Sequence, residues 1–216
     1  SQFASGCLKN LCGIDPTLGR LIIPFLLSAL DPQAVNQSHQ APLAMHALTD
    51  CLHPLLYPCP IALPYLPKLL ELSLPGVDPN DQQKSCTTLA MYVSLLGWVP
   101  LQKTYKAPRK ESWPPSHFAM MSSQSPIDTE YTALYNSFLD EPKLQANLNQ
   151  LAIAFQDWAP ALLDKVFDVV EAQDEPKKGK KTAHIVGFVA ECTSLLFQAC
   201  QDPNNDSALR TVLENK

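Results

Sequence analysis

Three histidines, His39, His46 and His53, recur at seven-residue intervals, and imidazole is the commonest protein ligand for transition metals. On a helix, seven residues separate two side chains by about 10 Å along the axis, whereas zinc holds each ligand atom at about 2 Å. The spacing therefore favours histidines at the edge of a core or groove. We expect no metal site and no cofactor in this chain.

The seven cysteines form no C-x-x-C pair, so Cys7 and Cys12 with His39 lack the spacing of a zinc knuckle. Cys192 and Cys200 fall on nearly the same face of an expected helix. A cysteine nucleophile needs a base and a group that orients it, and no base stands at a clear spacing from either thiol. We expect buried structural thiols in a reducing compartment, no catalytic residue and no enzyme. A helical enzyme domain with a cysteine nucleophile remains the alternative.

The dense basic run of the chain consists of Lys177, Lys178, Lys180 and Lys181. Such a run suits a nuclear import signal or an anion contact, and the alternative is a solvated loop whose charge is partly cancelled by acidic residues just upstream. The net charge of −5 gives no basic field that would attract nucleic acid or an anionic membrane. No apolar stretch approaches the roughly 20 residues that span a bilayer. We therefore expect neither nucleic acid nor a membrane as a direct partner.

The elements that would position these residues are helices. Apolar residues recur at helical spacing along most of the chain, without sustained period-two alternation and without an Asn-Gly or Asp-Gly hairpin turn. Twenty prolines and seven glycines suit rigid corners between helices. A first helix is expected to begin at Asp15-Pro16, and a long one, from Leu144 to about Val170, to kink or split at Pro160. The first of these helices has an expected apolar face of Leu18, Leu21, Ile22, Phe25, Leu26 and Leu30.

The segment from Leu74 to Asp81 reads Leu-Pro-Gly-Val-Asp-Pro-Asn-Asp and predicts a sharp turn between two helices. Gly76 is expected to end the first helix through its permissive backbone. Asp78 is expected to cap the second, and Pro79 to be its first residue. Asn80 or Asp81 would then lead into the long apolar helix.

Two weakly similar segments indicate a repeat. Pro24 and Pro67 lie 43 residues apart, and the Asp-Pro corners at Asp31 and Asp78 lie 47 apart, both within the period of about 40–47 residues of HEAT-type repeats. We predict an all-α chain of antiparallel helix pairs stacked as a HEAT/armadillo-like α-solenoid, with a non-repetitive helical bundle as the alternative. Residues 1–98 and 128–216 are expected to hold the helix pairs, 99–127 to form an irregular loop or linker, and 173–181 a charged loop.

The turn, Cys86 a few residues after it, and the exit Val99-Pro100-Leu101 together resemble an internal segment of the large single-chain HEAT-repeat proteasome activators of the Blm type. The helix from Leu162 to Glu171 is similar to the one that precedes an acidic and polar loop in that family. The resemblance covers most of residues 60–200. The family's C-terminal tail with a penultimate tyrosine does not occur here, so we expect that this segment alone does not open the proteasome gate.

This resemblance implies a non-catalytic scaffold in a protein that caps the end ring of the core proteasome and regulates its gate without ATP or ubiquitin. It also implies work in the nucleus and cytoplasm, DNA repair, degradation of acetylated histones, and inositol phosphates as ligands. A HEAT-repeat transport receptor or a phosphatase-type scaffold is the alternative within the same fold class.

Overall fold

The computed structural model describes residues 2–31, 40–56, 60–98, 141–172 and 182–199. Nearly all of these residues are helical, and none of them is in a strand. Three short 3₁₀ turns join the helices: η1 (Pro16–Leu18), η2 (Leu63–Tyr65) and η3 (Leu74–Gly76). The α-helices are α1 (Gln2–Ile14), α2 (Gly19–Ser28), α3 (Gln40–Leu56), α4 (Leu66–Ser73), α5 (Gln82–Trp98), α8 (Glu141–Glu171) and α9 (Thr182–Ala199). The predicted loop or linker at 99–127 and the charged loop at 173–181 lie outside the described residues.

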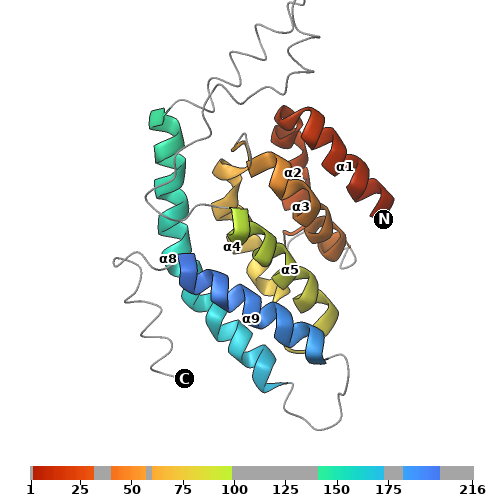
Figure 1. Cartoon of the computed structure of the whole chain (residues 1–216), viewed down its shortest axis with the longest axis vertical. Coiled ribbons are helices and arrows are strands. Elements are labelled where there is room, and N and C mark those ends of the chain that lie inside the picture. Colours follow the sequence, from red (N-terminus) through yellow and green to blue (C-terminus); the bar gives the residue numbers. More distant parts are fainter. Residues whose placement is uncertain (1, 32–39, 57–59, 99–140, 173–181, 200–216) are drawn as a thin grey trace, which may run out of the picture.

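The helices form two layers. In the first layer α1 packs on α3, α3 on α5 and α5 on α9, and Figure 1 shows these four helices as neighbouring, roughly parallel ribbons. In the second layer α2 contacts α4, and α4 contacts α8. The layers are joined within pairs, α2 with α3, α4 through η3 with α5, and α8 with α9. This order, in which each pair places one helix in each layer, is the arrangement of a helical solenoid.

One continuous hydrophobic cluster lies between the layers, from Cys12 in α1 to Leu196 in α9. Its largest fully buried side chains include Tyr92 and Phe155, which come from different pairs. Each pair therefore buries its apolar surface against its neighbour, as repeat architectures do. No helix among the described residues is long and apolar enough to cross a membrane.

Three prolines lie inside helices without ending them. Pro24 lies within α2, and Pro54 lies in the last turn of α3, which continues to Leu56. Pro160 lies within α8, which stays one helix of 31 residues and bends along its length in Figure 1. The helix does not split at this proline, and a bend is what the loss of one helical hydrogen bond at Pro160 was predicted to cause.

Two expectations for the first helices differ from the structure. The structure places α1 before Asp15, where no helix was predicted. In α2 the predicted apolar face is confirmed in part, since Leu26 and Leu30 are buried and Ile22 packs against the core. Leu21 and Phe25 are instead 74% and 73% exposed, and the buried side includes Ile23 and Leu27. In both helices, several large apolar side chains are exposed in the described structure.

Candidate functional site

The corner between α4 and α5 differs from its predicted form. The 3₁₀ turn η3 continues α4 through Gly76, and Val77 then turns to extended backbone with φ −84° and ψ 100°. The carboxylate of Asp78 accepts from the backbone N–H of Asn80 at 2.9 Å, which closes a local turn. Helix α5 begins at Gln82, and Asp81 caps it by accepting from the N–H of Lys84 at 3.0 Å. The roles predicted for Asp78 as helix cap and Pro79 as first helical residue were therefore wrong by three residues.

Gly76 is needed for space rather than for its backbone freedom. Its backbone lies outside the left-handed region, and a methyl group added to it would lie 2.7 Å from Met45 Cε of α3 and 3.1 Å from Thr88 Cγ2 of α5. The Thr88 hydroxyl donates to the Met45 sulfur at 2.9 Å beside it. Gly76 therefore does not end the helix through its permissive backbone, as was predicted. Glycine is needed there because η3, α3 and α5 approach one another closely.

Residues distant in sequence fix the corner in place. The Ser85 hydroxyl donates to the Asp78 carbonyl oxygen at 2.7 Å and accepts from the Asp78 N–H at 2.8 Å. From α8, Lys165 Nζ donates to the carbonyl oxygen of Val77 at 3.3 Å, and the Val77 side chain is fully buried. Helices α3, α5 and α8 therefore meet at this corner, which ties the α4–α5 pair to the pairs on both sides of it.

A polar contact lies under the same corner. The hydroxyls of Ser73 in α4 and Tyr92 in α5 are 2.9 Å apart, and both side chains are buried. Burial raises the pKa of Tyr92 well above its ordinary value, and the hydrogen bond with Ser73 offsets part of that rise. The Tyr92 ring meets Trp158 of α8 edge to face at a centroid distance of 4.8 Å. Aromatic pairs in this geometry add to the energy of burial, so this contact also joins neighbouring pairs.

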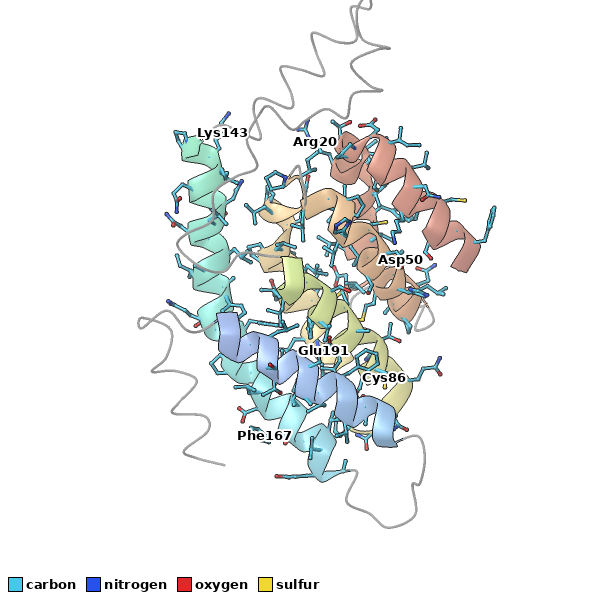
Figure 2. The ribbon with its side chains drawn as sticks, in the orientation of Figure 1. Arg20, Asp50, Cys86, Lys143, Phe167 and Glu191 are labelled. Atoms are coloured by element: carbon cyan, nitrogen blue, oxygen red, sulfur yellow. The ribbon has the colours of Figure 1, made fainter. Side chains whose placement is uncertain are left out.

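The histidines and cysteines do not come together. His46 is partly exposed on α3, with Nδ1 3.8 Å from Asp50 Oδ2 on the same helix, His53 is exposed one turn before the end of α3, and His39 lies outside the described residues. Within the described ranges, no three His, Cys, Asp or Glu side chains form a group that could hold a metal. Figure 2 shows charged side chains such as Asp50 and Lys143 spread over different helices rather than gathered.

The thiols that the structure describes in the core are poorly suited to nucleophilic attack. Burial raises the pKa of Cys192 to about 12, with a smaller contribution from the Glu191 charge, and the thiolate is the reactive form. A hydrogen bond with Cys12, together with burial, raises the pKa of Cys51. The same hydrogen bond lowers the pKa of Cys12, but the Cys12 side chain is fully buried and is closed to a substrate. Cys200 and the predicted import or anion site at Lys177, Lys178, Lys180 and Lys181 lie outside the described residues.

Sequence reasoning missed two features of this region. The contact of Lys165 with Val77 was not predicted, and no sequence signal could have paired the two residues, which lie 88 positions apart. The pattern of apolar residues in α1 was visible at positions 3, 7, 11 and 14, and helical spacing alone would have indicated it.

The two layers of antiparallel pairs and their shared core define an α-solenoid of the HEAT type. A family model described as proteasome activator complex subunit 4, mid HEAT repeats region, matches residues 1–215. The chain belongs to this family, and the resemblance to the HEAT-repeat proteasome activators is confirmed. Searches among curated proteins and among solved structures returned no significant match.

Proposed function

We propose that this chain is a non-catalytic scaffold segment of an activator that caps the core proteasome and regulates its gate without ATP or ubiquitin. Membership of the mid HEAT repeats region of proteasome activator subunit 4 is the observation that carries the proposal. The corner at 76–78 supports it, because contacts from α3, α5 and α8 fix the angle between consecutive pairs. A solenoid acts through the curved surface that such angles produce.

The test uses the full-length activator with the core proteasome. We expect the two to co-purify and the activator to speed hydrolysis of short fluorogenic peptides. Absence of binding by the full-length protein would overturn the proposal, and binding to a Ran-type GTPase instead would favour a transport receptor.

A pair of glycine substitutions tests whether this segment contributes by its shape. Gly76→Ala crowds the corner, whereas Gly97 in α5 has no atom within 4 Å of an added methyl group. We expect Gly76→Ala to reduce stimulation of peptide hydrolysis and Gly97→Ala to leave it unchanged. Equal stimulation by both variants would show that the geometry of this corner is irrelevant to activation.

We also propose that the segment performs no chemistry of its own. The raised pKa of the Cys192 thiol supports this, since an activated cysteine has a lowered pKa. Alkylation of the accessible thiols is expected to leave unchanged any catalytic turnover measured with the protein. Stoichiometric labelling of one cysteine with loss of a turnover would contradict the proposal and favour the helical enzyme.

For the full-length protein, the resemblance supports acetylated histones and inositol phosphates as ligands, a role in DNA repair, and residence in nucleus and cytoplasm. Lys177, Lys178, Lys180 and Lys181 are the proposed import signal. Replacing all four lysines by alanine should shift a fluorescent fusion of the full-length protein toward the cytoplasm. An unchanged distribution would assign the run to a solvated loop.

A further inference from the structure

Two buried thiols meet across the contact between α1 and α3. Cys12 of α1 and Cys51 of α3 are 0% and 1% exposed, and both are free thiols. The helices that carry them lie side by side in Figure 1 and pack against each other. The Cys51 thiol donates a hydrogen bond to the Cys12 sulfur. Because the two cysteines lie 39 positions apart in the sequence, this contact depends on the packing of α1 on α3.

Small side chains accompany both thiols on their helix faces. Ser5 lies seven residues before Cys12, and Ala44 and Ala47 lie seven and four residues before Cys51, so each set shares one side of its helix. All five side chains are buried. Helices that meet through small residues approach to about 8 Å between axes, which leaves facing Cα atoms about 4–5 Å apart. A disulfide usually joins Cα atoms about 4.4–6.8 Å apart, so α1 and α3 need not separate for one to form.

We propose that Cys12 and Cys51 are an oxidation site, at which hydrogen peroxide converts the two thiols to a disulfide that ties α1 to α3. In reducing compartments, disulfides are usually transient and sense oxidants or take part in catalysis. A pair of thiols in contact but not bonded suits the first of these roles. The proposal concerns the chemistry of one helix contact, and it stands whether or not the chain regulates the proteasome gate.

The hydrogen bond between the thiols decides which sulfur reacts first. It lowers the pKa of Cys12 against the opposing effects of burial and of the Asp15 charge, and it raises the pKa of Cys51. Since the thiolate is the nucleophile, the Cys12 sulfur attacks one oxygen of the peroxide and the O–O bond breaks. Cys12 becomes a sulfenic acid, and the released hydroxide takes up the Cys12 proton to form water.

The second step closes the disulfide. The Cys51 sulfur attacks the Cys12 sulfur, the S–O bond breaks, and the hydroxyl leaves as water with the Cys51 proton. The two thiols together lose two electrons, and one peroxide is reduced to two waters. A dithiol reductant restores both thiols by thiol–disulfide exchange.

Burial limits which oxidants reach the pair. Both sulfurs are closed to solvent in the folded chain, so reaction requires local opening of the contact between α1 and α3. A peroxide needs a much smaller opening than a peptide or an alkylating reagent does. The site therefore responds to a small oxidant while remaining closed to the substrates that a catalytic cysteine would need.

Oxidation of the full-length protein tests the site without any substitution. Hydrogen peroxide is added in increasing amounts, the remaining thiols are blocked, and unreduced peptides are identified by mass spectrometry. Cys192 is the reference, because it is equally buried and burial raises its pKa. We expect the linked Cys12–Cys51 peptide to form at least about tenfold faster than Cys192 is oxidised.

Three outcomes of this experiment would overturn the proposal. In the first, Cys192 is oxidised before any linked Cys12–Cys51 peptide appears. In the second, the linked peptide forms only when urea unfolds the protein. In the third, Cys12 or Cys51 forms its disulfide with a different cysteine.

Hydrogen exchange tests whether the disulfide ties the two helices together. In the full-length protein, peroxide should slow amide exchange in α1 at least about fivefold, because a cross-link suppresses local opening, and dithiothreitol should reverse the change. Cys51→Ala keeps a small apolar side chain and should abolish the response, whereas the matched Cys192→Ala should retain it. Unchanged exchange in the cross-linked protein, or an equal response of Cys51→Ala and the unsubstituted protein, would contradict the proposal.

Discussion

The dipeptide Asp-Pro stands at two described corners of the solenoid, and the two corners are built differently. At the first, the Asp15 carboxylate accepts from the Thr17 N–H at 3.0 Å, and Pro16 is the first residue of η1, which leads directly into α2. At the second, Asp78 and Pro79 stand outside any helix, and Asp81 caps α5. The hydrogen bonds described here at the first corner are local, although Gly19 just after it lies close to Leu55 of α3. The second corner is held by residues from α3, α5 and α8.

The difference shows how far a short motif determines geometry. Both aspartates accept from the N–H two residues on, so the local turn is the same at the two corners. The path of the chain after the turn differs, because at the second corner Ser85 holds the Asp78 backbone and Gly76 is pressed against α3 and α5. The chain needs three more residues there before it can enter a helix.

The largest expected effect comes from filling the space at the second corner. Gly76→Ala should lower the free energy of unfolding of the chain by up to about 3 kcal/mol, because the methyl group overlaps Met45 and Thr88. Gly97→Ala should be neutral or stabilise by up to about 1 kcal/mol, since alanine is the better helix former. Urea unfolding measures both. If Gly76→Ala left the free energy of unfolding unchanged, Met45 and Thr88 would be able to move and make room for the methyl group.

Removing the two hydrogen bonds between the Ser85 hydroxyl and the Asp78 backbone should have the next largest effect. Ser85→Ala leaves the Asp78 N–H and carbonyl without their partner, and we expect a loss of about 1–2 kcal/mol in the free energy of unfolding. Thr87→Ala, two residues on, removes a hydroxyl that bonds within its own helix at an exposed site and should change stability by less than about 0.5 kcal/mol. Equal losses would mean that the second corner is also a local structure.

Replacing each of the three aspartates tests which of them caps a helix. Asp15→Ala and Asp81→Ala each remove a cap at the start of a helical segment and should cost about 1 kcal/mol. Asp78→Ala removes a bond within an exposed turn and should cost less than either. Chemical unfolding of the three variants would rank them, and a cost for Asp78→Ala above that of Asp81→Ala would restore Asp78 as the cap.

The smallest expected effect belongs to the contact between neighbouring pairs. Lys165→Met keeps most of the apolar stem and removes the 3.3 Å hydrogen bond to Val77, so we expect a loss of no more than about 1 kcal/mol. Hydrogen exchange of amides near Val77 should rise more than exchange in α1, because the contact is local. A uniform rise would assign the effect to global stability instead.

The helices and the class of fold could be predicted from the sequence because apolar periodicity and the repeat offset are properties of short windows. Caps and corners could be predicted only where they are local, as at Asp15. Asp81, which was expected with Asn80 to lead into the long helix, caps it through a local bond to Lys84. The crowding at Gly76 and the contact of Lys165 depend on helices that come together through folding. Leu21 and Phe25 of α2 were assigned to its buried side, with Leu26 and Leu30, because they are as apolar as the buried Ile23 and Leu27. Periodicity does not tell which of several apolar residues is covered.

The contact of Lys165 with Val77 also has a mechanical consequence. The curvature and twist of a solenoid follow from the small rotations between neighbouring pairs. The donor belongs to α8 and the acceptor to the corner that precedes α5, and the Tyr92–Trp158 contact joins α5 to α8 nearby. Rotating the α8–α9 pair against the α4–α5 pair would stretch the hydrogen bond and slide the two rings apart together. These two side-chain contacts therefore add to the torsional stiffness that the packing of α5 on α9 and of α4 on α8 gives to this joint.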